Sequence, residues 1–213
     1  VVNLYCAGSA VVRLPSGNRV EIEQETGYPF DGTVTIRIKP SRPERFSLRL
    51  RIPSWSEQTV LDPGQAVVAK PAAPGQYAVL TKKWRTGDSV RLSLDMRGRV
   101  VRDSSGLNFA VLRGPLVLAR DSRLEDRGHS VDEAIQRPEE KDGYIELMPD
   151  SATGEKDFQL VLGAPVIGDP ASRDSGPRQV IHLCDYASAG GWNTGARFRV
   201  WLPLLLDISQ RRK

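Results

Sequence analysis

Residues 19–39 read RVEIEQETGYPFDGTVTIRIK, and this stretch decides the fold. Apolar side chains occupy every second position of residues 33–39, and residues 19–25 show the same period with acidic side chains in between. A period of two is typical of a strand with one buried and one solvated face. Residues 29–32, PFDG, separate the two runs and carry the glycine that such a turn favours. The stretch therefore predicts a hairpin in which acidic side chains face basic ones.

The same period extends outward from this hairpin. It recurs at residues 45–53 and 89–96, and Pro and Gly residues separate the runs at short intervals. Only residues 130–137, SVDEAIQR, suit a short helix, with Ser130 as N-cap and Glu133 completing a capping box. Further strands are expected in the second half at 107–119, 143–149, 157–162, 178–186 and 196–204. The pattern predicts an all-β fold made of antiparallel, jelly-roll-like β-sandwich modules.

A change in charge suggests a boundary near residues 103–106. Basic side chains outnumber acidic ones in residues 1–105, and the order is reversed in residues 106–213. We expect a first β-sandwich module at 1–105 and a second module at 106–213, packed together. Long polar loops are expected in the second module, because residues 121–142 and 163–177 exceed the length of ordinary sandwich connections.

The composition argues against several classes of protein. The chain has 213 residues, 39% hydrophobic and 26% charged, which is typical of a folded protein. No apolar run approaches the roughly 18 residues that a membrane-spanning helix requires. The net charge is +4, and the arginines alternate singly along strand-like runs instead of forming a basic cluster. We therefore expect neither nucleic acid nor a membrane as a partner.

The chain is poor in catalytic and metal-binding side chains. It has two cysteines, Cys6 and Cys184, and two histidines, His129 and His182. On a strand, His182 and Cys184 would share one face, where they could activate the thiol or bind a metal. A buried thiol beside a hydrogen-bonded ring is the simpler interpretation. We therefore expect no catalytic, cofactor-binding or metal-binding residue in this chain.

The four tryptophans could stack on sugar rings, since indole has a flat apolar face and a polar edge. Trp84 lies just before a Gly-Asp turn and Trp201 lies between Val200 and Leu202, and both are expected to be packing residues. Trp192 lies in a glycine-rich loop, residues 188–195, and is the best candidate for an exposed ring. The candidate contacts to carbohydrate or to a neighbouring domain are Trp192, Trp55, Asp31 and Tyr186, although capping of its turn would also explain Asp31.

Seven segments, taken together and in order, resemble a known family. They are VNLY at 2–5, TGYPFDG at 26–32, LRIPSW at 50–55, GQY at 75–77 with KWRTGD at 83–88, VLRGPLV at 111–117, DYASAG at 185–190 and FRVWLP at 198–203. Their order and spacing are similar to the C-terminal part of the bacterial β-L-arabinofuranosidase family, glycoside hydrolase family 127. The resemblance covers essentially the whole chain. Phe30 stands where the family usually has Trp, which affects the expected substrate subclass more than the fold.

The resemblance implies that these β-sandwich domains follow an (α/α)6 barrel that carries the active site. In the family, a cysteine nucleophile and a zinc ion held by cysteines and a glutamate belong to that barrel. No residue of this chain matches those positions, and neither Cys6 nor Cys184 matches the family's cysteine motif. The resemblance therefore implies zinc only in the barrel, no cofactor in this chain, and the barrel of the same polypeptide as its partner.

Three functions stay open on the sequence. The favoured one is a non-catalytic C-terminal β-sandwich region of a β-L-arabinofuranosidase-like glycoside hydrolase, which supports the barrel and helps to shape its cleft. The second is a carbohydrate-binding module that recognises plant-type glycans. The third is a small hydrolase built on His182 and Cys184. An exposed apolar patch would favour the first function, and a groove lined by aromatic side chains would favour the second.

Overall fold

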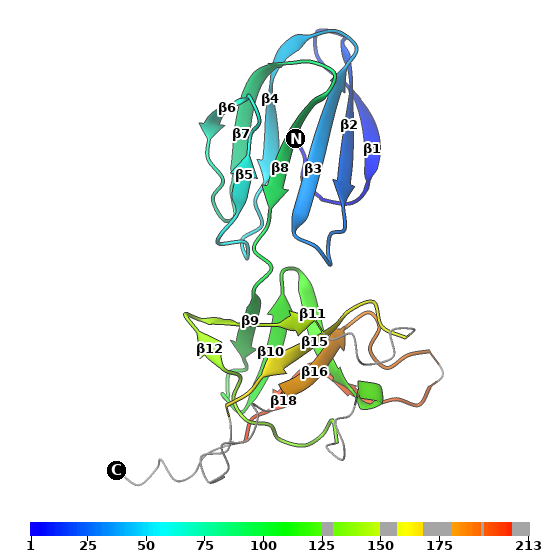
Figure 1. Cartoon of the computed structure of the whole chain (residues 1–213), viewed down its shortest axis with the longest axis vertical. Coiled ribbons are helices and arrows are strands. Elements are labelled where there is room, and N and C mark those ends of the chain that lie inside the picture. The colour runs from blue at the N-terminus through cyan, green and yellow to red at the C-terminus, as the bar shows by residue number, and fades with distance from the viewer. Residues whose placement is uncertain (125–129, 150–156, 168–179, 193, 206–213) are drawn as a thin grey trace. The chain divides into compact units, whose positions relative to one another are not determined.

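The computed structural model of the chain describes residues 1–124, 130–149, 157–167, 180–192 and 194–205. The chain divides into two units, Val1–Met96 and Arg97–Lys213. The described residues contain one short 3₁₀ turn, Ser122–Leu124, and no α-helix, and all strand pairs are antiparallel (Figure 1). The prediction of an all-β, antiparallel fold is therefore confirmed.

The first unit is a sandwich of two sheets. Its strands are β1 (Gly8–Arg13), β2 (Arg19–Thr26), β3 (Thr33–Pro40), β4 (Glu44–Arg51), β5 (Val60–Asp62), β6 (Val67–Lys70), β7 (Tyr77–Trp84) and β8 (Asp88–Ser93). One sheet has the order β1-β2-β3-β8-β5, and the other has the order β4-β7-β6. Figure 1 shows the two sheets as separate layers within this unit.

The hairpin predicted from residues 19–39 forms as β2 and β3. Glu23 lies opposite Arg37 in the register of the two strands. On the solvated face, the guanidinium of Arg37 lies 2.7 Å from the Glu25 carboxylate, and Lys39 Nζ lies 2.6 Å from the Glu23 carboxylate. The expected pairing of acidic and basic strand faces is confirmed, and it explains these glutamates without a catalytic role.

The opposite face of the hairpin builds the core of the first unit. Side chains from β3 and β8 meet side chains from β4 and β7 in one apolar cluster. Its fully or almost fully buried members on these strands are Val34, Ile36, Ile38, Leu48, Leu50, Ala78, Leu80, Trp84, Val90 and Leu92. Trp84 is buried as predicted, and its Nε1–H donates to the Phe46 carbonyl oxygen at 2.9 Å.

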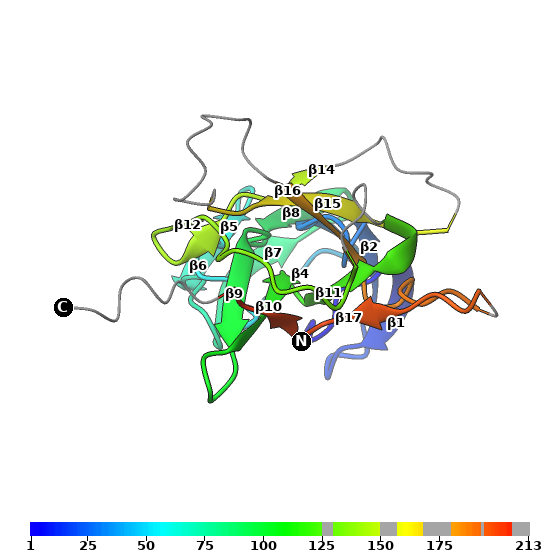
Figure 2. The same ribbon diagram turned by 90° about the horizontal axis from the view of Figure 1, so that it is seen from below.

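The second unit is built around one sheet that curls. Its strands are β9 (Gly98–Arg102), β10 (Asn108–Arg113), β11 (Leu116–Asp121), β12 (Glu140–Lys141), β13 (Tyr144–Ile145), β14 (Met148–Pro149), β15 (Val161–Pro165), β16 (Val180–Asp185), β17 (Phe198–Arg199) and β18 (Leu202–Pro203). The sheet follows the order β12-β13-β9-β10-β11-β16-β15-β14, with β17 on β11 and β18 on β10. In Figure 2, β15 and β16 lie opposite β9 and β10. A second apolar cluster fills the interior of this curled sheet.

Three sequence expectations for the second unit are wrong. The strand expected at residues 157–162 forms instead at Val161–Pro165, partly within the expected loop. Residues 130–137 form no helix, because Ile135 pairs instead with the last strands, donating its amide to the Pro203 carbonyl at 2.9 Å. Trp201 is 45% exposed, because alternation along the chain turns its neighbour Leu202 into the core.

The sign of the net charge changes within a turn of the second unit. Residues 103–106 form the turn between β9 and β10, and these two strands pair directly with each other. The division between the two units lies earlier in the chain, between Met96 and Arg97.

The buried face of β8 gives a first prediction. Leu92→Ala removes a fully buried side chain and is expected to lower the free energy of unfolding of the first unit by about 2–5 kcal/mol. Hydrogen exchange of the β3 amides in the native chain measures this change. Val60→Ala is the control, because Val60 pairs with β8 from the edge of the same sheet and is 65% exposed. An equal effect of the two substitutions would contradict the assigned core.

Candidate functional site

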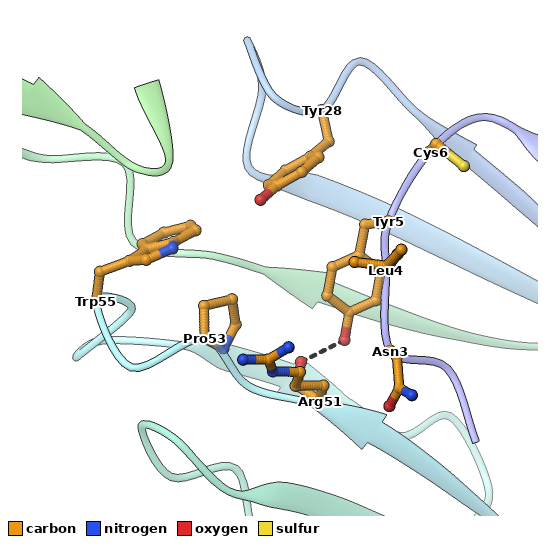
Figure 3. Close-up of a pocket in the computed structure, with 8 residues that line it drawn as sticks. All are labelled: Asn3, Leu4, Tyr5, Cys6, Tyr28, Arg51, Pro53 and Trp55. Carbon is orange, nitrogen blue, oxygen red and sulfur yellow. Dashed lines mark hydrogen bonds between the residues drawn. The ribbon is translucent and has the colours of Figure 1, made fainter. Parts of the chain in front are cut away.

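The first unit has a hollow of about 390 Å³ at the edge of its core (Figure 3). Three segments form it: the residues before β1, the turn between β2 and β3, and the end of β4 with the turn that follows. The residues that line it are Asn3, Leu4, Tyr5, Cys6, Tyr28, Arg51, Pro53 and Trp55. Five of these are uncharged polar or aromatic side chains, one is cationic, and none is acidic, so the hollow suits a ligand with both apolar faces and polar groups.

Backbone pairing places the N-terminal segment along β4. The Val2 amide donates to the Arg49 carbonyl at 2.8 Å, and the Arg51 amide donates to the Val2 carbonyl at 3.0 Å. Farther along, the Tyr5 hydroxyl donates to the Arg51 carbonyl oxygen at 2.6 Å. These contacts hold residues 3–6 as one wall of the hollow.

Aromatic side chains form the other walls. The rings of Tyr5 and Tyr28 meet edge to face, with centroids 6.2 Å apart and an interplanar angle of 77°. Burial raises the pKa of both phenols, so they stay protonated at neutral pH. Figure 3 shows the Tyr28 hydroxyl and the Trp55 ring directed toward the same space, with Pro53 below them.

Hydrogen bonds within two turns hold Tyr28 and Trp55 in position. The Tyr28 amide donates to Thr26 Oγ1 at 3.0 Å at the start of the turn between β2 and β3. Asp31 closes the same turn, because its carboxylate accepts the Thr33 amide at 2.9 Å. On the other side, a backbone bond of 3.1 Å from the Ser56 amide to the Pro53 carbonyl closes the turn that carries Trp55.

In the second unit, a buried carboxylate organises a loop. Asp121 is fully buried and accepts hydrogen bonds from Arg123 Nε at 2.9 Å and from Arg123 Nη2 at 2.8 Å. It also accepts the Gly190 amide at 2.6 Å, and Arg123 donates to the Ser188 carbonyl at 2.7 Å. Burial by itself raises the pKa of Asp121, but the hydrogen bonds from Arg123 and Gly190 outweigh it and hold that pKa below its ordinary value.

A second buried carboxylate supports the same loop. Asp185, at the end of β16, accepts the Ser188 amide at 3.0 Å and the Ser188 hydroxyl at 2.9 Å. Its other oxygen accepts the Leu160 amide at 3.0 Å, which ties the loop to the neighbouring segment. The loop between β16 and β17 is therefore attached to the second unit through backbone and side-chain groups.

This loop carries two of the sequence candidates. Trp192 is 94% exposed, as predicted for the glycine-rich loop. Tyr186 is exposed too, and its ring meets the ring of Phe198 edge to face at 5.8 Å. These residues belong to the second unit, whereas Trp55 and Asp31 belong to the first, so the four candidates lie in two separate places.

The surroundings of Cys184 agree with the simpler interpretation, a buried thiol. The thiol is fully buried, and its Sγ lies 3.6 Å from the Ala119 carbonyl oxygen. Burial, reinforced by the nearby charges of Asp121 and Asp185, raises the pKa of Cys184 to about 12, so the thiolate is not populated at neutral pH. A hydrolase that uses His182 and Cys184 would need that thiolate, which argues against the third function.

Two further kinds of site were sought in the part of the chain that the structure describes. No group of three or more His, Cys, Asp and Glu side chains comes together there to hold a metal ion. No helix of the described segments is long and apolar enough to cross a membrane. His129 lies outside the described residues.

The first unit, which contains the hollow, matches a known protein family. The family model described as "Beta-L-arabinofuranosidase, GH127 middle domain" matches residues 1–96. Residues 1–96 are a GH127 middle domain. The matched range ends where the first unit ends, so the hollow and both sheets of the sandwich belong to the GH127 middle domain.

Solved structures extend the similarity to the second unit. A glycoside hydrolase is 27% identical, with a TM-score of 0.70 over 96% of this chain and 35% of its own. Ara127N-Se, a GH127 β-L-arabinofuranosidase from Geobacillus stearothermophilus T6, is 22% identical, with a TM-score of 0.67 over 95% of this chain and 33% of its own. The GH127 β-arabinofuranosidase BT3674 is 24% identical, with a TM-score of 0.66 over 98% and 35%.

The similarity covers only part of each solved structure. This chain spans about a third of the length of the solved structures that it matches. The two structures below 25% identity show that the fold of both units is shared. No curated protein matches the chain.

Sequence reasoning named one residue of the hollow, Trp55, as a site candidate and missed Tyr5, Tyr28 and Arg51 as its neighbours. Tyr28 was visible as part of a turn motif, but nothing in the sequence placed it beside Trp55. The buried Asp121 was also missed, because a carboxylate at the end of a strand looks like a solvated residue until its partners are known.

The Asp121 network predicts a pH-dependent loop. Since the folded pKa of Asp121 lies below its ordinary value of 3.8, its contribution to stability is present above pH 3.8 and is lost as the pH falls through the folded pKa. Asp121→Asn is expected to remove this dependence and to destabilise the loop by about 1–3 kcal/mol. Hydrogen exchange of the Gly190 amide, corrected for its intrinsic pH dependence, measures both effects.

Asp142→Asn provides the control for that measurement. Asp142 is exposed in a different turn, and its φ of 53° is a conformation that Asn also adopts readily. Protection of Gly190 that is unchanged in the Asp121→Asn variant would show that the carboxylate does not hold the loop.

The two thiols are expected to react very differently. Cys6 is exposed and Cys184 is buried with a raised pKa, so N-ethylmaleimide at pH 7 should modify only Cys6 in the native chain. Peptide mapping by mass spectrometry identifies the labelled residue, and Cys6→Ser should leave the native chain unlabelled. Rapid labelling of Cys184 without denaturant would show that its surroundings open.

Proposed function

We propose that this chain is the non-catalytic β region of a β-L-arabinofuranosidase-like glycoside hydrolase, which supports an (α/α)6 catalytic barrel of the same polypeptide and helps to shape its cleft. The match of residues 1–96 to the GH127 middle domain carries this proposal. The solved structures support it, since each of them is about three times as long as this chain and contains a region of similar fold as one part.

An apolar surface near the N-terminus fits the docking of such a barrel. Val1 and Leu4 are each 75% exposed, and Val11 and Val12 on β1 are 57% and 45% exposed. Val11 and Val12 are adjacent on a strand, so they point to opposite faces of the sheet, and neither face is covered there. Val1, Leu4 and Val12 line a second hollow of about 440 Å³, together with Ile22 and Gln24 of β2. Apolar surface of this kind marks an interaction site.

The chemistry of the parent enzyme is assigned to the barrel. Cys184 is a buried, protonated thiol, and the described residues offer no set of three metal-ligating side chains. We therefore place the cysteine nucleophile and the zinc ion of the family outside this chain. The role left for the β region is mechanical: it covers apolar barrel surface and positions the loops that border the cleft.

A carbohydrate-binding module is the second candidate. Two observations favour it, the aromatic hollow around Trp55 and the fully exposed ring of Trp192 on its anchored loop. Either place could stack on a sugar ring. The two functions are compatible, because a domain that docks on a barrel can also bind part of the substrate.

The proposed function predicts where activity and stability reside. The purified 213-residue chain should not hydrolyse 4-nitrophenyl β-L-arabinofuranoside, whereas the protein encoded by the same reading frame extended upstream should hydrolyse it. In that longer protein, Leu4→Asp places a charge in the docking surface and is expected to lower the Tm by several degrees. The same substitution should leave the Tm of the 213-residue chain unchanged, since Leu4 is 75% exposed there.

Val60→Asp is the matched control, because Val60 is 65% exposed on β5 and lies outside both hollows. Measurable hydrolysis by the pure 213-residue chain would overturn the non-catalytic assignment. Equal effects of Leu4→Asp and Val60→Asp on the longer protein would overturn the docking surface.

A further inference from the structure

We propose that the hollow around Trp55 and Tyr28 binds a carbohydrate that carries a carboxylate, of the uronate class. The inference rests on the proposed function only for its context, a domain of a glycosidase. The binding itself depends on the residues that line the hollow, and these all belong to the first unit.

The dimensions of the hollow suit a small ligand. Its volume of about 390 Å³ falls in the range of roughly 300–1,000 Å³ that small-molecule sites occupy. Tyr28 and Trp55 are half-buried at the edge of the core and line the hollow. A sugar ring has flat C–H faces, and aromatic rings are the side chains that match such faces.

Polar groups in the hollow are free to bind. Within the described part of the chain, neither the Tyr28 hydroxyl nor the Trp55 Nε1–H has a hydrogen-bond partner, and Figure 3 shows both side chains directed toward the same space. Asn3 uses its Oδ1 to accept from the Tyr77 hydroxyl at 2.7 Å, which leaves its amide N–H groups to donate. Apolar faces combined with several donors are what a polyhydroxylated ring requires.

The charge in the hollow identifies the class of sugar. The Arg51 guanidinium lines the hollow, forms no ion pair with any described residue, and has no acidic neighbour among the lining residues. An arginine can bind a carboxylate with two parallel hydrogen bonds, which a hydroxyl group cannot match. A ligand with a carboxylate would therefore bind more tightly than its neutral counterpart.

The hollow is formed before any ligand arrives. The Tyr5 hydroxyl is held in a fixed place by donating to the Arg51 carbonyl, and the hydroxyl of Ser56, the residue after Trp55, accepts the Asp95 amide at 2.8 Å. Since these groups are already ordered, binding would not have to order them, and a preorganised site gains affinity for that reason.

The test is a titration of the 213-residue chain with trigalacturonate, followed by amide chemical shifts and by calorimetry. Trigalacturonate is expected to bind at least about tenfold more tightly than neutral galactotriose, and the difference should shrink as salt is added. Arg51→Gln should abolish the preference for the acidic sugar while weak binding of both sugars remains. Trp55→Ala should weaken both by about tenfold or more.

Matched variants keep the result interpretable. Arg49→Gln changes an exposed arginine on the same face of β4 outside the hollow, and Trp192→Ala removes the exposed ring of the second unit. Neither should change the affinity, and well-dispersed amide spectra show that each variant is folded. Tyr28→Phe, which keeps the ring and removes the hydroxyl, should weaken binding less than Trp55→Ala does.

Three results would overturn the inference: no binding of either sugar at millimolar concentration, equal binding of both sugars, or shift changes that cluster at Trp192 instead of Trp55. Leu4 lines both hollows, so the docking of a barrel is tested by a different measurement, the Tm of the longer protein, and not by sugar binding.

Discussion

The alternation of side chains along β3 is the constraint on which the first unit depends. Val34, Ile36 and Ile38 all point into the core and are fully buried, while Arg37 and Lys39 point outward to the carboxylates of β2. A slip of one residue in the register would reverse every side chain, exposing three apolar groups and burying two cations. The ion pairs on the solvated face are individually weak. Their arrangement nevertheless favours the same register that the core requires, so local and tertiary preferences agree.

The hollow is a consequence of how that sandwich is closed. The turn after β2 carries Tyr28, the turn after β4 carries Trp55, and the N-terminal segment attached to β4 brings Tyr5 beside Tyr28. All three rings pack on the edge of the core, so the stability of the sandwich also fixes the geometry of the site. A residue such as Tyr5 therefore has two roles, since it completes the core and forms one wall of the hollow.

In the second unit, buried carboxylates hold a glycine-rich loop in place. Glycines at positive φ, such as Gly190, allow the tight path of the loop, and the buried carboxylates of Asp121 and Asp185 bind its amides. Buried charges are expensive unless they are paired and hydrogen-bonded. Here Arg123 and the backbone donors satisfy Asp121, and the result is a fixed platform on which Trp192 is exposed.

The sequence by itself determined the all-β class, the β2–β3 hairpin with its charge pairing and the burial of Trp84, because a period of two is a local property of the chain. It did not predict β7, where Val79 and Lys82 interrupt the alternation and the Lys82 ammonium lies over the ring of Trp84, 5.9 Å from its centroid. It predicted a helix at residues 130–137, where pairing of Ile135 with the last strands outweighed a capping box. Which rings share a hollow and which carboxylates are buried depends on the folded chain, because those neighbours come from segments far apart in the sequence and meet only once the sheets have formed.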